Sequence, residues 1–556
     1  MHRFKSIKLY FFSILKFFFS NFKEYYFSSN FYNKKLSTLI PTRFFYYPSS
    51  YLSGSLTTAG NDFYKINYTS PELLWKMDYS NKLQFDNLHG FLWLVRLDRK
   101  NSKIITKNII DSWINIFSNY EPNTWKMEIM AKRIIAWSSN ADITLENADK
   151  VYKEKFFLSL VKQANFLIKN LKDLNYSSKK IICCSGIILS GMIFKEYELN
   201  YKIGIKELEK IIKYFFDDDG FPKSRNPEDV FISIKYLILI REWMKEAQKP
   251  IPDFLNEIIQ KCGKCYSLLV GENKQFPLFN GSSEINHDDY DRFLKSLKYK
   301  FNTTNHEIGG FIKVKRGKLE FFIDCGNPPH NNFASQYQAG CLSFELISNK
   351  QKVICNTGYG KYSSSKLKSL SRVTAAHSTL YLNNTSSCTF EKNKTINKMY
   401  GSSLVEKHKI IKKNYIENND FYEIIASHNG YEKKFGYTHT RLVKILKNED
   451  KIFGQDELTN TGRYSGNIIY FIRFHIYPNT KIIKTKGGNS VLISLSNGEG
   501  WLLKSESNNL EIEKNIFLGN KNRMINNQSI LISGYLPGNL KEKEVVSIKW
   551  IIEKIS

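Results

Sequence analysis

The residues that first suggest chemistry in this chain are Cys262 and Cys265, because a Cys-x-x-Cys pair can bind a metal or exchange electrons. A zinc ribbon needs a second such pair at a suitable spacing, and the sequence has none. The eight cysteines are also sparse for 556 residues, so they do not indicate a disulfide scaffold. We therefore interpret Cys262 and Cys265 as ordinary cysteines on a helix.

A second polar cluster comprises Arg225, Asn226 and Glu228, which flank Pro227 and follow a turn. Such side chains can contact a polar or charged ligand. They also fit a structural role, because Asn before Pro is favoured where a helix begins and a carboxylate is stabilised in the first helical turn. The sequence leaves both interpretations open.

His377, Trp93 and Trp137 form a third group of candidates. A histidine can transfer protons near neutral pH, and an indole ring can stack on the face of a sugar. Each residue also has a structural alternative, since a buried histidine can bond a backbone carbonyl and tryptophan is commonly a core residue. Residue type alone does not separate these alternatives.

The elements that must position these residues change in character along the chain. From about 84 to 270, apolar residues recur every three or four positions, as in Phe85, Leu88 and Phe91, which predicts an array of helices. After about 300 the period becomes two, and the runs on either side of Gly317 predict a β-hairpin. More than 200 residues of short strands after a helical half predict a large β-sandwich and a separate helical domain.

The net charge is +28, from 81 Lys and Arg against 53 Asp and Glu. A positive field concentrates polyanions, including acidic polysaccharides, nucleic acids and anionic membranes. Codon bias in an A/T-rich genome explains the same lysine excess, so this interpretation stays open beside the first. No zinc-finger spacing or RNA-recognition string occurs, so we do not expect a nucleic-acid partner.

Several strings in a fixed order resemble those of the heparinase II/III-like polysaccharide lyases, over about residues 60–550. They are residues 88–94, 133–137, 219–228, 338–345 and 372–379. The resemblance implies an α+β, two-domain fold, with an N-terminal incomplete (α/α) toroid followed by a large antiparallel β-sandwich. The expected boundaries are a lead-in at 1–60, the toroid at 61–271, a linker at 272–300 and the sandwich at 301–556.

The resemblance also implies a chemistry, β-elimination at a uronic acid. A base removes the C5 proton, an acid protonates the departing C4 oxygen, and another group neutralises the sugar carboxylate. Matching the family's motifs, we expect the catalytic residues to be Tyr362, His377 and Tyr337. The expected substrate-binding residues are Arg225, Asn226, Glu228, Arg372, Gln336, Gln338, Trp93 and Trp137.

The sequence departs from the family's pattern at the metal and base positions. Gln336 and Gln338 stand where the family has two histidines, and Gly340 and Asn356 stand where it has acidic residues. Amide side chains are poor zinc ligands, so we predict no metal and no cofactor. The family's helical tyrosine base is also replaced. Two functions therefore stay open: a lyase for uronic-acid polysaccharides, and a glycan-binding or envelope-assembly protein that has lost the chemistry.

The N-terminal segment has several interpretations. Basic residues precede the aromatic stretch from Leu9 to Phe22, which Lys16 interrupts, so it is too short and too charged for a membrane-spanning helix. It fits a poor signal peptide, an interfacial helix or an amphipathic helix docked on the protein. The family resemblance predicts the cell envelope or periplasm, with the cytoplasm left open. The expected partner is an acidic polysaccharide or oligosaccharide, and residues 1–25 are a candidate for peripheral membrane contact.

Overall fold

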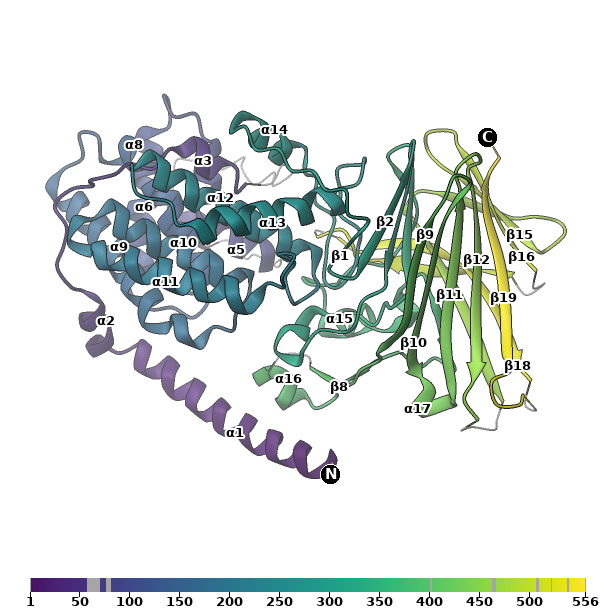
Figure 1. Cartoon of the computed structure of the whole chain (residues 1–556). Helices are drawn as coiled ribbons and strands as arrows, with labels where there is room; N and C mark the ends of the chain where they lie inside the picture. The colour runs from purple at the N-terminus through teal and green to yellow at the C-terminus, as the bar shows by residue number, and fades with distance from the viewer. Residues whose placement is uncertain are drawn as a thin grey trace. The chain divides into compact units, whose positions relative to one another are not determined.

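The protein is described by a computed structural model that covers residues 2–57, 71–76, 82–400, 403–462, 467–506, 510–521, 523–537 and 540–555. The chain forms two compact units, which Figure 1 shows in one colour ramp from the N- to the C-terminus. Unit 1 comprises Met1–Pro222, Asp229–Gly263 and Asp288–Phe301, and unit 2 comprises Lys223–Glu228, Lys264–His287 and Asn302–Ser556.

Unit 1 is helical. Its elements are α1 (His2–Phe27), α2 (Asn30–Leu36), α3 (Ser50–Gly54), α4 (Pro71–Lys76), α5 (Lys82–Gly90), η1 (Leu92–Arg96), α6 (Lys103–Phe117), α7 (Met127–Ser138), α8 (Ala141–Leu145), α9 (Lys150–Asn170), η2 (Leu171–Asp173), α10 (Ser178–Ile193), η3 (Lys195–Tyr197), α11 (Glu198–Phe215) and α14 (Asp288–Ser296). Two further helices, α12 (Pro227–Glu246) and α13 (Asp253–Leu269), cross the sequence boundaries between the units.

Helix α10 forms the centre of unit 1 because residues from Lys180 to Ile193 are buried on every side. It packs against α7, α9 and α11, and Gly186 permits the approach to α7. A Cβ atom at Gly186 would come within 3.1 Å of Ala131. Cys262 and Cys265 are buried on α13 and form no disulfide, as expected for ordinary helix cysteines.

Unit 2 is built on two antiparallel sheets. Among the described residues one sheet contains β1 (Glu307–Ile308), β2 (Phe311–Arg316), β3 (Leu319–Asp324), β4 (Phe344–Ser348), β5 (Gln351–Cys355), β6 (Leu380–Leu382), β13 (Ile468–Ile476), β17 (Leu510–Phe517) and β18 (Ile525–Leu536). The other contains β9 (Ile410–Glu417), β10 (Phe421–Tyr431), β11 (Tyr437–Leu446), β12 (Lys451–Asn460), β14 (Lys481–Lys484), β15 (Ser490–Ser494), β16 (Gly500–Ser505) and β19 (Val545–Lys554).

Short elements complete unit 2. They are η4 (Asn331–Gln336), α15 (Ser365–Leu370), η5 (Thr374–Ala376), β7 (Thr389–Phe390), α16 (Lys394–Tyr400), β8 (Leu404–Glu406) and α17 (Glu432–Phe435). The predicted hairpin around Gly317 is confirmed, with Arg316 of β2 paired to Leu319 of β3 and Gly317 at a positive φ of 53°. A helical region followed by an antiparallel sandwich confirms the predicted fold class.

The core of unit 2 lies between the two sheets. Buried and exposed residues alternate along β11 and β12, as expected for strands with one inward face. Phe344 of β4 stacks on Trp550 of β19 with ring centroids 5.6 Å apart, so aromatic side chains from both sheets meet in the same hydrophobic cluster. This packing fixes the sandwich on which the loops of unit 2 are mounted.

A chain of polar side chains runs through this core along neighbouring strands. The Gly430 amide donates to His428 Nδ1 at 3.0 Å, so in the neutral ring Nε2 carries the proton and donates to His439 Nδ1 at 3.2 Å. His439 Nε2 then donates to Asp456 Oδ1 at 2.7 Å. Arg441 and the Trp550 indole N–H also donate to Asp456, which completes what we call the Asp456 network.

The expected domain segments are distributed between the units as follows. The expected linker, 272–300, contributes residues up to His287 to unit 2 and α14 to unit 1. Residues 223–228, inside the range expected for the toroid, belong to unit 2. The expected lead-in, 1–60, contains α1, α2 and α3 in its described part.

Candidate functional site in unit 2

The candidate residues of unit 2 surround the segment from η4 to Gly340. Arg372 supports this segment from within, because its Nε donates to the Tyr337 carbonyl at 2.7 Å and its Nη2 to the Ala334 carbonyl at 2.9 Å. The guanidinium also lies 4.2 Å from the centroid of the Phe390 ring and is almost fully buried. Arg372 therefore positions the backbone that carries Gln336, Tyr337 and Gln338.

Arg225 is also bound to other parts of unit 2. Its Nη2 pairs with Asp324 Oδ1 at 2.6 Å, and its Nε donates to the Gly309 carbonyl at 2.9 Å. The side chain is buried over the Phe311 ring, and the backbone has a positive φ of 57°, which is uncommon for a residue with a Cβ atom. These contacts offset the strain and hold Arg225 away from solvent.

Asn226 combines the two roles that the sequence left open. Its Oδ1 accepts the Glu228 amide at 2.8 Å, as a residue does when it caps the start of a helix. Its Nδ2 donates to Gln336 Oε1 at 2.7 Å. Because Gln336 is half-buried, this bond connects the start of α12 to a side chain that reaches the surface.

Glu228 lies under two lysines, which we call the lysine pair. Glu228 Oε1 is 2.8 Å from Lys521 Nζ and 3.5 Å from Lys361 Nζ, while Oε2 has no hydrogen-bond partner among the described residues. Burial alone would raise the pKa of Glu228, but the attraction of Lys361 and Lys521 outweighs it and lowers the pKa to about 2. The lysine side chains remain 24% and 22% exposed. These three groups together carry one positive charge.

Tyr362 is next to this cluster and is half-buried. Lys361 Nζ lies 5.5 Å from the centroid of its ring. We call Gln336, Tyr362, Lys361 and Lys521 the polar rim, because all four reach solvent. Contacts through Asn226 and Glu228 link Gln336 to the two lysines, and Tyr362 lies beside Lys361. A cationic and hydroxyl-bearing surface of this kind can bind the carboxylate or sulfate of an acidic sugar.

Tyr337 and His377 lie in the interior. Tyr337 and His377 are each 1% exposed, and burial raises the pKa of Tyr337 well above its ordinary value. Burial also lowers the pKa of His377 to about 3, and neither ring nitrogen has a partner of normal hydrogen-bond geometry among the described residues. Both side chains are shielded from a ligand at the surface of unit 2.

The positions where the family binds a metal hold amides that are already bonded. Gln338 Nε2 donates to the carbonyls of Ser371 at 2.6 Å and Gly358 at 3.2 Å, and its Oε1 accepts the Gly281 amide at 2.9 Å. Asn356 Oδ1 accepts the Ser378 amide at 3.0 Å. Neutral amides with their lone pairs occupied do not fit a zinc ion.

Gly340 also bears on this question, because it stands where the family has an aspartate. A Cβ atom there would lie 2.9 Å from both Cγ and Nδ1 of His377. The His377 ring therefore occupies the space that an acidic side chain would need. Among the described residues, no group of three or more His, Cys, Asp and Glu side chains is arranged to hold a metal ion.

Trp93 and Trp137 lie in unit 1 and belong to its core. Trp93 is 5% exposed and donates to the Leu88 carbonyl at 3.1 Å, while Trp137 is fully buried and packs edge-on against Trp113. No face of either ring is open to a sugar. These positions favour the structural alternative for both tryptophans.

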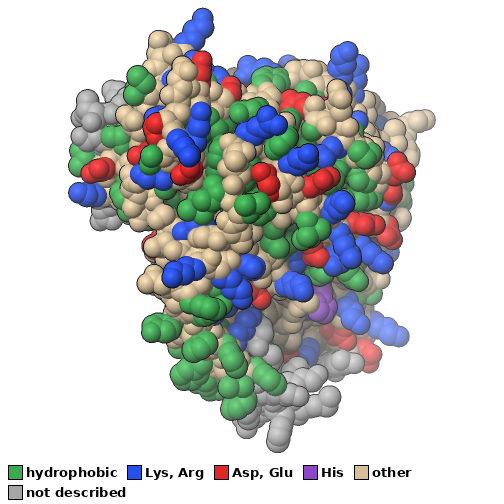
Figure 2. All heavy atoms as spheres, turned by 90° about the vertical axis from the view of Figure 1, so that its left-hand side faces the viewer, with side chains coloured by type: hydrophobic (Ala, Val, Ile, Leu, Met, Phe, Trp, Pro, Cys, Tyr) green, Lys and Arg blue, Asp and Glu red, His purple; other side chains and the backbone are tan. Residues whose placement is uncertain are grey.

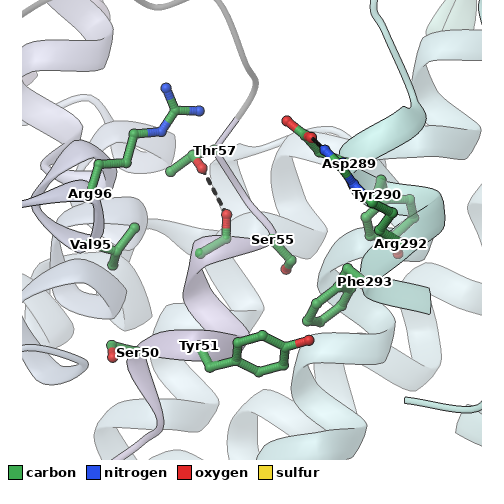
Figure 3. A pocket seen from close by; sticks show the side chains of 11 residues that line it. Ser50, Tyr51, Ser55, Thr57, Val95, Arg96, Asp289, Tyr290, Arg292 and Phe293 are labelled. Carbon is green, nitrogen blue, oxygen red and sulfur yellow. Dashed lines mark hydrogen bonds and ion pairs between the residues drawn. The ribbon is translucent and has the colours of Figure 1, made fainter. Parts of the chain in front are cut away.

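Unit 1 has a hollow elsewhere, with a volume of about 830 Å³. Figure 3 shows Val95 and Arg96 on one side of it and Phe293 on the other, with Tyr51 below. Sequence reasoning did not identify these residues. They come from η1, α3 and α14, and no local motif connects segments so far apart in the chain.

Sequence reasoning also missed the lysine pair. Lys361 directly precedes the candidate Tyr362 in the sequence, so a search for charged residues next to each candidate would have found it. Lys521 gave none, because it lies about 300 residues from Glu228 in a loop with no recognisable pattern. Only the tertiary fold brings Lys521 to Glu228.

Residues 303–551 match the family described as Heparinase II/III-like, C-terminal. Residues 303–551 are thus similar to the heparinase II/III-like C-terminal domain, which agrees with the resemblance of the sequence motifs.

Similarity to known proteins extends beyond that domain. The fold is similar to the crystal structure of heparinase III, with a TM-score of 0.67, 16% identity, and coverage of 86% of this chain and 79% of that chain. It is also similar to the heparan sulfate lyase HepC from Pedobacter heparinus, with a TM-score of 0.56, 14% identity, and coverage of 86% and 78%. FtsZ-localized protein C of Caulobacter vibrioides is 21% identical over 454 residues, which cover 77% of this chain and 75% of that protein.

Proposed function

We propose that this protein binds an acidic polysaccharide at the polar rim of unit 2. The observation that carries the proposal is the lysine pair, in which two partly exposed ammonium groups share one buried carboxylate. Glu228 holds the lysines in place, and their summed charge still favours an anion. The names of the similar structures, heparinase and heparan sulfate lyase, point to a uronic-acid-containing glycan as the ligand class.

The expected strength of each contact is modest. A hydrogen bond between an ammonium and a carboxylate or sulfate contributes about 1–3 kcal/mol when partly shielded, and less when fully exposed. A polymer offers many anionic groups, so it can engage Lys361 and Lys521 together. Binding of this type weakens as salt screens the charges.

The positions of the other candidates support binding without turnover. Tyr337 and His377 are buried, and Arg225 and Arg372 are bonded within unit 2. An elimination needs a base within hydrogen-bond reach of the C5 proton and a group that neutralises the sugar carboxylate. Of the predicted catalytic residues, Tyr362 is the one whose side chain reaches the surface of unit 2.

This position of Tyr362 favours a second candidate function, β-elimination in a rearranged site. In its deprotonated form Tyr362 would take the C5 proton while the C4–O bond breaks and a C4–C5 double bond forms, and its hydroxyl would then protonate the departing C4 oxygen. Lys361 would neutralise the carboxylate as negative charge develops on the sugar. The observation behind this candidate is the 5.5 Å separation between Lys361 Nζ and the Tyr362 ring. It differs from the first candidate in requiring turnover.

One experiment tests both candidates. The full-length protein is incubated with a panel of uronic-acid polymers, and binding is measured by calorimetry while ultraviolet absorbance reports the unsaturated product. The variant Lys361→Ala/Lys521→Ala removes two charges from the rim. The matched control Lys366→Ala/Lys412→Ala removes two exposed charges elsewhere in unit 2.

Binding that the rim variant weakens about tenfold, and the control leaves unchanged, supports the first candidate. An absorbance increase that Tyr362→Phe abolishes supports the second. If no polymer binds and no absorbance develops, both candidates are wrong.

We also propose that the protein acts in the cell envelope or periplasm, where such polysaccharides are found. The support is the family resemblance. Among the described residues no helix has both the length and the apolarity needed to cross a bilayer. Fusion of residues 1–57 to a phosphatase that is active only after export tests the proposal, since an inactive fusion would contradict it.

A further inference from the structure

Helix α1 exposes a row of large apolar side chains. Phe11, Leu15, Phe18, Phe22 and Tyr25 are separated by steps of four and three residues, so they share one face of the helix. The exposed fractions are 65% for Phe18, 71% for Phe22 and 78% for Tyr25. Figure 2 shows apolar side chains gathered near the lower edge of the visible face. We call these five residues and Phe12 and Phe19, which are also exposed, the aromatic stripe.

The end of α1 nearest the body of unit 1 is fixed by packing. The Phe27 ring contacts those of Tyr32, Tyr120 and Phe166, with centroids 4.8, 5.2 and 5.1 Å apart. Lys23 forms an ion pair with Asp173. The aromatic stripe precedes this anchor, and the described residues of unit 1 leave its side chains exposed. An exposed apolar surface of this size commonly marks a place of contact with another body.

The charges around the stripe indicate what kind of body fits. Residues 1–35 hold seven Lys and Arg residues and one acidic residue, Glu24. Lys16 lies seven positions before Lys23, so both are on the flank of the helix between the stripe and the side that packs on unit 1, where Lys23 pairs with Asp173. Apolar rings along one face and cations beside them are the pattern of a helix that lies in a lipid–water interface.

We propose that α1 docks on an anionic lipid surface, with the aromatic stripe inserted among the acyl chains and headgroups. Aromatic rings are favoured at this depth, and lysines beside them attract the negative surface of the bilayer. The helix is 26 residues long and lies in the plane of the surface, which its charged flank requires. The inference is independent of the polysaccharide proposal, since it concerns α1 alone.

Co-sedimentation with vesicles tests the proposal in the full-length protein. One vesicle preparation contains phosphatidylglycerol and phosphatidylcholine, and a second contains phosphatidylcholine alone. We expect binding to the first, at least about tenfold weaker binding to the second, and weaker binding at high salt. Equal binding to both preparations, or to neither, contradicts the proposal.

The variant Phe18→Ser/Phe19→Ser/Phe22→Ser removes the centre of the stripe. It should weaken binding to anionic vesicles at least about tenfold, because each ring loses its apolar burial. The matched control Ile104→Ser/Leu199→Ser/Tyr535→Ser removes three side chains that are as exposed but lie outside α1. The control should bind as the unsubstituted protein does, and equal losses in both variants would overturn the proposal.

A fluorescent label reports where the stripe lies. All eight native cysteines are buried, so Phe19→Cys supplies one accessible thiol for an environment-sensitive dye. Emission should rise and shift to shorter wavelength with anionic vesicles, whereas the same dye at Tyr535→Cys should not respond. No response at residue 19 would overturn the proposal.

A second copy of the chain is the alternative occupant of the stripe. Sedimentation equilibrium without lipid distinguishes the two, since the proposal expects the same mass for the unsubstituted protein and the triple serine variant of α1. A dimer that this variant dissociates, together with absent vesicle binding, would assign the stripe to self-association instead.

Discussion

Two clusters in unit 2 place cationic or proton-donating side chains around one buried carboxylate, yet they differ in what remains open. In the Asp456 network, His439, Arg441 and Trp550 satisfy both carboxylate oxygens, and the carboxylate and its His and Arg partners are fully buried. In the polar rim, Glu228 leaves one oxygen without a partner and its two lysines reach solvent. A buried carboxylate whose partners are also buried contributes to stability alone. A buried carboxylate whose lysine partners reach solvent leaves positive charge accessible to a ligand.

The largest expected effect follows from breaking the closed cluster. Asp456→Ala leaves Arg441 buried without its counter-ion, which should lower the free energy of unfolding by about 3–5 kcal/mol. Urea denaturation followed by circular dichroism measures the change. Asp450→Ala is the control, because it breaks the partly exposed ion pair with Arg316, for which we expect a loss of about 1 kcal/mol or less. Equal losses would contradict the distinction between closed and exposed clusters.

The second prediction concerns acid. Burial lowers the pKa values of His428 and His439 below the ordinary 6.5, so the unfolded chain binds protons that the folded chain does not. Stability should therefore begin to fall as the pH drops below about 6.5. Burial would raise the pKa of Asp456, but Arg441 and His439 lower it, so its contribution is present above about pH 4 and is lost below that value.

Thermal unfolding between pH 7 and pH 3 measures this dependence. The substitution His428→Gln removes one titrating ring and should flatten the part of the curve between pH 6.5 and 4. A melting temperature that is constant or rises as the pH falls through that range would contradict the prediction.

The third prediction concerns the open cluster. Lys361→Ala/Lys521→Ala should weaken binding to an acidic polysaccharide about tenfold, which corresponds to ~1.4 kcal/mol, and should reduce the dependence of binding on salt. The free energy of unfolding should also fall, because the two substitutions leave Glu228 buried without its counter-charges. Calorimetric titration at two salt concentrations measures the first effect and urea denaturation the second.

The smallest expected effect comes from Glu228→Gln. The amide keeps the shape of the side chain and removes one negative charge beneath the lysine pair, so polyanion binding should tighten roughly threefold. The same titration measures it, with Glu417→Gln as a control because Glu417 pairs with Lys447 at an exposed site away from the rim. Weaker binding by Glu228→Gln would mean that the carboxylate positions the lysines more than it neutralises them.

Much of the fold could be predicted because its signals are local. The change from helical to alternating periodicity marks the transition to strands, and the pair of runs around Gly317 specifies a hairpin. Strand β11 was harder to recognise, because its inward positions include His439 and Arg441. A polar residue on the buried face hides the alternation that apolar residues would reveal.

The candidate site depends on contacts that no local pattern contains. The residue type of Asn226 and the proline after it predicted that Asn226 caps a helix, and its Oδ1 does accept the Glu228 amide. Its hydrogen bond to Gln336, by contrast, joins residues more than a hundred positions apart in the sequence. The burial of Tyr337 and His377 likewise depends on how η4 and η5 pack. Motif matching locates such residues in the chain but does not indicate whether they face solvent.

The most direct test of the central claim is the simultaneous measurement of binding and turnover on a panel of uronic-acid-containing acidic polysaccharides. The account predicts saturable binding that Lys361→Ala/Lys521→Ala weakens about tenfold, with no increase in ultraviolet absorbance over many hours. An absorbance increase from unsaturated uronate, lost in Tyr362→Phe, would contradict it, as would binding that the rim variant leaves unchanged.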